Sequence, residues 1–125
     1  MTTPLVFLAI CLAGGVGSSL RFVLDGVIKA RVSRFPVATV VINVTGSFGL
    51  GLLTGLGTAA GLPHEWVLIL GGGLMGGYTT FSTASVETVR LVHDRRYGAA
   101  ALYGIGMLVV SIAASGLGLV LGGAF

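Results

Sequence analysis

The chain has 125 residues, of which 54% are hydrophobic and only 9% are charged, and its mean hydropathy is +1.03. A soluble domain of this length could not bury so much apolar surface, which excludes a water-soluble enzyme or binding module and indicates an integral membrane protein. The formal net charge of +3 could suggest nucleic acid. The basic residues gather around predicted loops, however, so we expect no nucleic-acid partner.

Four apolar stretches follow one another, at about residues 4–24, 36–60, 66–92 and 97–125. Each exceeds the roughly 20 residues that a helix needs to cross the hydrocarbon core of a lipid bilayer. We therefore predict an all-α membrane protein with a single domain, residues 1–125, made of four transmembrane helices.

All seven Lys and Arg residues lie around the first and third predicted loops: Arg21, Lys29, Arg31, Arg34, Arg90, Arg95 and Arg96. The second loop and the two termini carry none. Cytoplasmic loops of membrane proteins hold an excess of basic residues. We therefore predict a multi-pass protein of the cell membrane with both termini outside.

The first stretch carries small residues, which allow another helix to approach closely. They are Gly14, Gly15, Gly17, Ser18 and Ser19. Arg21 follows within one turn, where it could hold a contact between helices, draw anions into a vestibule, or place its charge at the membrane surface. Asp25 and Lys29 are expected to be surface charges at the end of the helix.

The second stretch carries a polar and small stripe on one helical face, because its members recur every four residues. They are Thr39, Asn43, Ser47, Gly51 and Gly55. An unpaired amide in hydrocarbon costs several kcal/mol, so Asn43 must face protein, water or an ion. Either it makes a hydrogen bond to another helix, or it lines a polar cavity, which the rest of the stripe favours.

The third stretch contains the run GGGLMGGYTTFST at residues 71–83. Adjacent glycines followed by two threonines favour a helix that is broken near its middle, with free backbone groups inside the membrane. Carbonyls freed around Gly76 and Gly77 suit a hard cation, whereas the N–H groups and hydroxyls of residues 79–81 suit an anion. The threonine hydroxyls could also cap the freed backbone groups.

The part that follows the break is polar where a membrane helix should touch lipid, so it is expected to face the interior of an assembly. Its polar residues are Ser82, Thr83, Ser85, Glu87 and Thr88. Glu87 and Arg90 are spaced for an ion pair near the cytoplasmic surface. In the fourth stretch, Tyr103 is either an interfacial aromatic residue or, with Ser111, part of a second polar lining.

The groups near the break are donors: the amide of Asn43, the hydroxyls of Ser82, Thr83 and Ser111, and the electropositive ring edge of Phe81. No acidic residue lies at mid-membrane, which argues against a proton-coupled cation exporter. The pattern therefore fits a small, strongly hydrated anion. No catalytic constellation is present, so we do not expect an enzyme.

Three motifs carry a resemblance to a known family. Residues 76–83, GGYTTFST, resemble the third-helix motif of the CrcB/Fluc fluoride channel family. Residues 41–48, VINVTGSF, look like its second-helix motif, and residues 14–22, GGVGSSLRF, look like its first. With the length and the four predicted helices, the resemblance covers essentially the whole chain.

The resemblance implies a fluoride-specific channel, an antiparallel dimer that passively exports fluoride and lowers its cytoplasmic concentration. It also implies a structural sodium ion at the dimer centre, bound by the backbone carbonyls of Gly76 and Thr79 from both subunits. Arg21 and Glu87 would belong to the vestibule or to the helix framework. The fluoride pathway would be formed by Asn43, Phe81, Ser82, Thr83, Tyr103 and Ser111.

One position departs from the family pattern, which commonly has a second phenylalanine three residues after the first, where this chain has Ala84. In addition, an antiparallel homodimer needs a chain that inserts in both directions, yet the basic bias of this chain is complete. Both observations favour a related second subunit of opposite orientation, with a homodimer as the alternative. The competing functions are a non-conducting partner subunit of a fluoride channel and a small four-helix exporter.

Overall fold

The computed structural model describes residues 3–32 and 35–125, and in these ranges the regular structure is entirely helical. The elements are α1 (Pro4–Lys29), α2 (Val37–Ala59), α3 (His64–Trp66), η1 (Val67–Met75), α4 (Gly76–Tyr78), α5 (Ser82–His93) and α6 (Tyr97–Gly123). The elements α3, η1 and α4 follow one another without a gap and form the first half of the third predicted segment. Its second half is α5.

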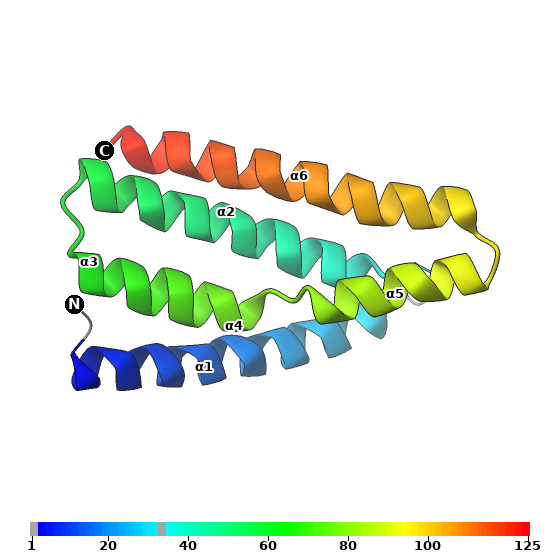
Figure 1. The fold of residues 1–125 in the computed structure, drawn as a ribbon, viewed down its shortest axis with the longest axis horizontal. Coiled ribbons are helices and arrows are strands. Elements are labelled where there is room, and N and C mark those ends of the chain that lie inside the picture. Colours follow the sequence, from blue (N-terminus) through cyan, green and yellow to red (C-terminus); the bar gives the residue numbers. More distant parts are fainter. Residues whose placement is uncertain (1–2, 33–34) are drawn as a thin grey trace.

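Four segments form one layered bundle, in the order α6, α2, third segment and α1; α6 and α2 run in one direction, and the third segment and α1 run in the other (Figure 1). By length and composition, α1, α2 and α6 are each able to cross a membrane as continuous helices. The third segment is bent and interrupted at residues 79–81. The prediction of four helices with a broken third is therefore confirmed, whereas the antiparallel dimer stays a prediction.

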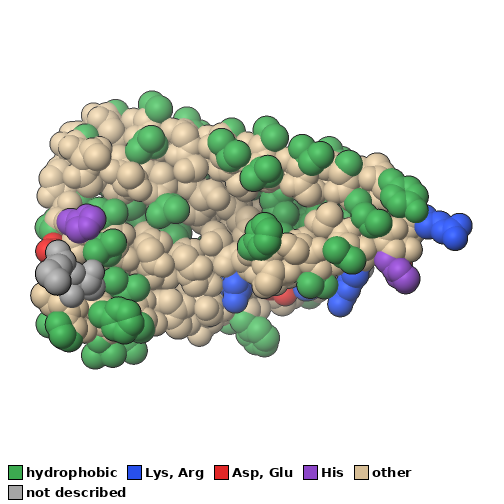
Figure 2. All heavy atoms as spheres, viewed as in Figure 1, with side chains coloured by type: hydrophobic (Ala, Val, Ile, Leu, Met, Phe, Trp, Pro, Cys, Tyr) green, Lys and Arg blue, Asp and Glu red, His purple; other side chains and the backbone are tan. Residues whose placement is uncertain are grey.

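The two ends of the bundle differ in charge. α1 begins and α6 ends at the same end, where α2 also connects to α3 (Figure 1). On the face drawn in Figure 2, the Lys and Arg side chains lie from the middle of the molecule toward the other end. Arg34, one of the basic residues counted above, lies outside the described residues. The bundle thus has the charge asymmetry on which the positive-inside prediction depends.

α2 and α6 pack closely because glycines on each helix face the backbone of the other. A Cβ atom on Gly51 or Gly55 would collide with the backbone of α6. One on Gly118 or Gly122 would collide with the backbone of α2. Close backbone approach of this kind drives helix association in membranes. The glycines at the end of the predicted α2 stripe therefore serve packing against α6.

α1 makes the same kind of contact with the first half of the third segment. A Cβ atom on Gly17 would collide with the carbonyl of Leu74, and one on Gly77 would collide with the backbone of Gly14. The small-residue surface predicted for the first stretch is thus confirmed as a packing face. Because Gly77 lies two residues before the break, this contact also brings α1 to the break.

Candidate ion site at the helix break

The break consists of Thr79, Thr80 and Phe81, between α4 and α5. Thr79 has φ −81° and ψ 160°, an extended conformation that takes the chain out of its helical course. In a continuous helix the N–H of Thr80 would bond to the carbonyl of Gly76. Here that N–H donates to a side chain of α2 instead, so the Gly76 carbonyl loses its helical partner.

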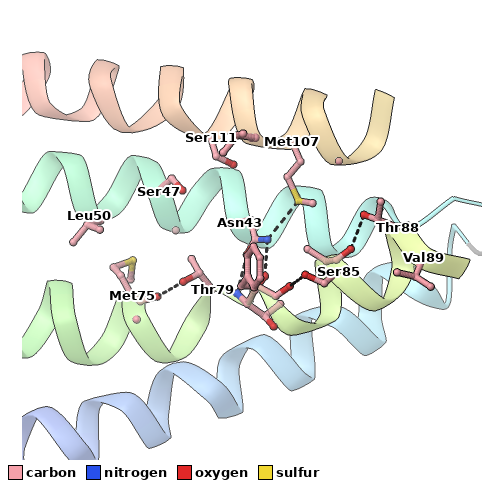
Figure 3. Close-up of a pocket in the computed structure, with 17 residues that line it drawn as sticks. Asn43, Ser47, Leu50, Met75, Thr79, Ser85, Thr88, Val89, Met107 and Ser111 are labelled. Atoms are coloured by element: carbon pink, nitrogen blue, oxygen red, sulfur yellow. Dashed lines mark hydrogen bonds between the residues drawn. The ribbon is translucent and has the colours of Figure 1, made fainter. Parts of the chain in front are cut away.

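Asn43 of α2 holds the peptide groups of Thr80 through both ends of its side-chain amide (Figure 3). Its Oδ1 accepts a hydrogen bond from the Thr80 N–H at 2.8 Å, and its Nδ2 donates to the Thr80 carbonyl at 2.9 Å. Nδ2 also lies 3.4 Å from Sδ of Met107 on α6. Asn43 therefore makes the contact between helices that was one of its two expected roles.

The two threonine hydroxyls bond to the helix ends at the break. Thr79 Oγ1 donates to the Met75 carbonyl at 3.1 Å, at the end of the first half. Thr80 Oγ1 accepts from the Thr83 N–H at 3.2 Å, at the start of α5. The Thr83 N–H thereby gains the partner that a helix N-terminus lacks, whereas the Met75 carbonyl also accepts the Thr79 N–H at 3.0 Å. The predicted capping by a threonine hydroxyl is confirmed for Thr80.

Two side chains of α1 bind carbonyls near the break. Arg21 Nη1 donates to the Thr79 carbonyl at 3.0 Å, and Ser18 Oγ donates to the Gly77 carbonyl at 3.2 Å. Of the roles left open for Arg21, the contact between helices is the one the structure contains. A bond from a guanidinium is charge-assisted, so it is stronger than a bond between neutral groups. Arg21 thus fixes Thr79 and brings positive charge beside the break.

A pocket of about 620 Å³ opens beside the break, between α2, the third segment and α6 (Figure 3). Of the site residues expected from the sequence, it brings together Asn43, Gly76, Thr79, Phe81 and Ser111. Its wall also includes Ala84, the position where the family commonly has a second phenylalanine.

Three of the residues expected to form the fluoride pathway are not on the pocket wall. Ser82 and Thr83 form the first turn of α5, directly after the break. Tyr103 is only 1% exposed and packs edge-on against the ring of Phe35, with ring centroids 5.5 Å apart.

The ring of Phe81 is 87% exposed, so its own chain leaves it almost uncovered at the break. The hydroxyls of Tyr103 and Ser111 have the opposite surroundings. Both oxygens are buried, and neither makes a hydrogen bond of good geometry within the described residues, although the Tyr103 hydroxyl lies beside the side chains of Thr39 and Glu87. A buried polar group without a partner costs free energy, so these two donors mark places where a bound ion or water would be stabilised.

Glu87 does not form the predicted ion pair with Arg90; in the described part of the chain, the ion pair is Lys29 with Asp25, at 3.1 Å. Instead, the Glu87 carboxylate accepts a hydrogen bond at 2.5 Å from Oγ1 of Thr39, a residue that is 1% exposed. The pairing prediction was wrong because the Glu87 carboxylate is turned toward Thr39 of α2, whereas Arg90, one turn further along α5, is exposed.

Three contacts at the break were not predicted: the hydroxyl of Ser18, the backbone of Thr80 as the partner of Asn43, and the sulfur of Met107. Spacing gave a signal for Met107, which lies one turn from both Tyr103 and Ser111 on the same face of α6. No group of three or more His, Cys, Asp or Glu residues that could hold a metal occurs in the described ranges. The oxygens that surround the break are main-chain carbonyls and hydroxyls, the ligand type that hard cations prefer.

The fold and the break together define a class: a small multi-pass membrane protein with one interrupted helix over a partly polar pocket. Residues 8–119 match the family described as CrcB-like protein, Camphor Resistance (CrcB). The chain belongs to this family.

Three relatives show how closely the chain follows known members. It is 58% identical to the fluoride-specific ion channel FluC 1 of Leifsonia xyli subsp. xyli, over 97% of this chain and 89% of that protein. It is 44% identical to FluC 2 of Mycolicibacterium paratuberculosis, over 93% and 89% of the two chains. It is 46% identical to FluC 2 of Cutibacterium acnes, over 94% and 98%.

Proposed function

We propose that the chain is a subunit of a fluoride-specific ion channel, which lets fluoride leave the cell passively and so lowers its cytoplasmic concentration. Relatives that carry this name match it along nearly its whole length, the nearest of the three at 58% identity. The observation that carries the proposal is the interrupted third segment, where hydrogen-bond donors meet a pocket inside a membrane bundle. The protein is a channel and not an enzyme.

Fluoride is strongly hydrated, so a pathway must replace its water with other donors. In our proposal Ser82 and Thr83 supply hydroxyls at the N-terminus of α5, where the helix dipole also favours an anion. The buried hydroxyls of Tyr103 and Ser111 supply two more donors, since neither is used within the described chain. The exposed Phe81 ring offers its electropositive edge.

Asn43 has a double role in this proposal. It lines the pocket and so forms part of the fluoride pathway, and it also fixes the Thr80 backbone. Arg21 and Glu87 act in the helix framework, because each is bound to another segment: Arg21 to the Thr79 carbonyl and Glu87 to Thr39. The positive charge of Arg21 additionally favours an anion near the break.

A sodium ion fits the main-chain oxygens of the break. The Gly76 carbonyl has lost the Thr80 N–H as its partner, and the Thr79 carbonyl keeps a second lone pair beside its bond from Arg21. These two carbonyls, with their counterparts in a second subunit, would hold the ion at the dimer centre. The ion would supply positive charge that stabilises the crossing of two interrupted segments.

The second subunit is proposed to lie antiparallel to the first. The exposed Phe81 ring and the pocket beside the break both give such a partner a surface to cover. The termini of this chain would then lie outside the cell, opposite its basic end. The complete basic bias favours a related partner chain over a homodimer.

A second candidate function is a subunit that completes a partner's pathway and conducts poorly through its own. Ala84 favours it, because it leaves a methyl group in the pocket wall where the family commonly has an aromatic ring.

Fluoride efflux from liposomes that contain this chain alone tests the proposal. Vesicles are loaded with potassium fluoride, valinomycin is added, and released fluoride is read with an electrode; chloride-loaded vesicles and protein-free vesicles are the controls. We expect fluoride release without chloride release from the chain alone or, where it needs a partner, from the chain together with a related subunit. Efflux by the chain alone would disprove the need for a different partner. Absence of efflux, both alone and with a related subunit of opposite basic bias, would disprove the channel function.

A matched pair of variants tests the pathway. Phe81→Ile should lower the initial rate about tenfold if the ring contacts the ion, because one favourable ion contact is worth about 1–2 kcal/mol. Phe22→Ile changes a ring on α1 that is 81% exposed and off the pocket, so its rate should equal that of the wild type. Equal rates for the two variants would leave Phe81 a role in packing alone.

A further inference from the structure

One face of α6 carries two unused hydroxyls with a thioether between them. The oxygens of Tyr103 and Ser111 are buried without hydrogen-bond partners among the described residues. Met107 lies four residues from each, so its side chain occupies the same face of the helix. It is only 8% exposed and lines the pocket at the level of the break. A line of donors along α6 is therefore interrupted at its middle by a group that has no donor.

The sulfur of Met107 also accepts an N–H from Asn43 on the facing helix α2. The Asn43 amide gives one N–H to the Thr80 carbonyl and directs Nδ2 to the Met107 sulfur at 3.4 Å, while its oxygen is taken by the Thr80 N–H. As Figure 3 shows, the methionine side chain extends from α6 straight toward Asn43. With Met107 in this position, the amide has no N–H left for an ion in the pocket.

A thioether suits this position poorly if an anion has to pass. Sulfur in methionine is a weak hydrogen-bond acceptor and donates nothing, so it offers a bare anion no replacement for water. Transfer of an ion past an apolar side chain without compensating bonds is strongly unfavourable. An anion moving along the pocket from Ser111 toward Asn43 would meet this step directly, since all three residues line it.

We infer that Met107 is the barrier to fluoride along this chain's own α6, and that replacing it with a small hydroxyl residue opens the route. The inference rests on the proposed fluoride channel function and adds the residue that limits the rate. Serine at this position would supply a donor between the other two hydroxyls and would release the Asn43 N–H toward the pocket. Fluoride would then move along α6 by exchanging a hydrogen bond from one hydroxyl for a hydrogen bond from the next.

Fluoride efflux of four purified proteins in liposomes tests the inference: wild type, Met107→Ser, Met107→Leu and Val109→Ser. Met107→Leu keeps an apolar side chain of similar volume without the sulfur. Val109→Ser makes an apolar-to-serine change at a residue that is 58% exposed and off the pocket. We expect Met107→Ser to raise the initial rate about tenfold, since one added donor to an ion contributes about that factor. Val109→Ser should stay within about twofold of the wild type, and Met107→Leu, which frees the Asn43 N–H but adds no donor, should raise the rate less than Met107→Ser does.

The outcomes separate the inference from the function on which it rests. Efflux by the wild type with an unchanged rate in Met107→Ser overturns the inference and leaves the channel function in place. A rise in Val109→Ser as large as that in Met107→Ser would show general loosening of α6 and also overturns it. If none of the four proteins releases fluoride, although each elutes as a single folded species, the chain alone does not conduct. That result also contradicts the opening of a route at Met107.

Discussion

Asn43 binds both the N–H and the carbonyl of Thr80, so a side chain of α2 replaces the helical partners that the third segment lacks at its break. At Thr80 the break is therefore held by the bundle itself. Most of the expected behaviour of the protein follows from how these freed backbone groups are satisfied.

Replacing Asn43 by Ala should destabilise the protein by about 2–4 kcal/mol, because the N–H and the carbonyl of Thr80 each lose a partly buried bond. Asn43→Asp should be at least as harmful, since a carboxylate would face the Thr80 carbonyl. Thermal unfolding in detergent measures the effect. Thr54→Ala is the control, because that exposed hydroxyl bonds only to the Leu50 carbonyl of its own helix. Equal melting temperatures for Asn43→Ala and the control would contradict the prediction.

Alanine at the close-contact glycines should destabilise the bundle by about 1–3 kcal/mol, because overpacking forces backbones apart. Gly17→Ala on α1 and Gly118→Ala on α6 would each drive a Cβ atom into a neighbouring backbone. Gly15→Ala and Gly116→Ala lie on the same helices with no atom within 4 Å of the added Cβ, so they should be neutral or slightly stabilising. The difference in unfolding midpoint within each pair is the measurement; its absence would refute the packing assignment.

Thr39→Val should cost about 1.5–3 kcal/mol, because it keeps the shape of a fully buried side chain and removes the donor to a partly buried carboxylate. In a protein that already carries Glu87→Gln, the further change Thr39→Val should lower the free energy of unfolding by less. The reason is that a neutral amide without a partner costs less than an unpaired carboxylate. A double-mutant cycle by unfolding gives the coupling between the two residues. Additive effects of the two substitutions would contradict a direct interaction.

Removing sodium should lower thermal stability if the carbonyls of Gly76 and Thr79 hold that ion. A ligand at 100 times its Kd stabilises the folded state by about 2.7 kcal/mol, so the shift should depend on sodium concentration. Melting curves in sodium chloride and in N-methyl-D-glucamine chloride at equal ionic strength measure it. Identical midpoints in the two salts across the whole concentration range would argue against the sodium site.

Much of the architecture could be predicted from the sequence. Apolar length predicted the four segments, and the glycine–threonine run predicted the break, since few other residues tolerate a broken backbone in lipid. The cap by Thr80 followed from the same reasoning. These features depend on local chemistry, which one sequence carries in full.

Contacts between distant residues could not be predicted in the same way. Asn43 and Met107 lie 64 positions apart, and their contact depends on how α2 and α6 are rotated against each other. The wrong pairing of Glu87 with Arg90 has the same origin, because spacing along one helix does not tell which face meets α2. The Arg21 contact with Thr79 was one of several roles open to Arg21, and packing of α1 against the break selected it.

The partners of the break come from the same chain: Ser18 and Arg21 from α1, and Asn43 from α2. A single copy can therefore complete its interrupted segment before it meets another copy. Insertion and assembly then become separate events, because each subunit is complete in the bilayer before it meets its partner. Pairing has only to join preformed surfaces, which allows a partner of different sequence as readily as an identical one.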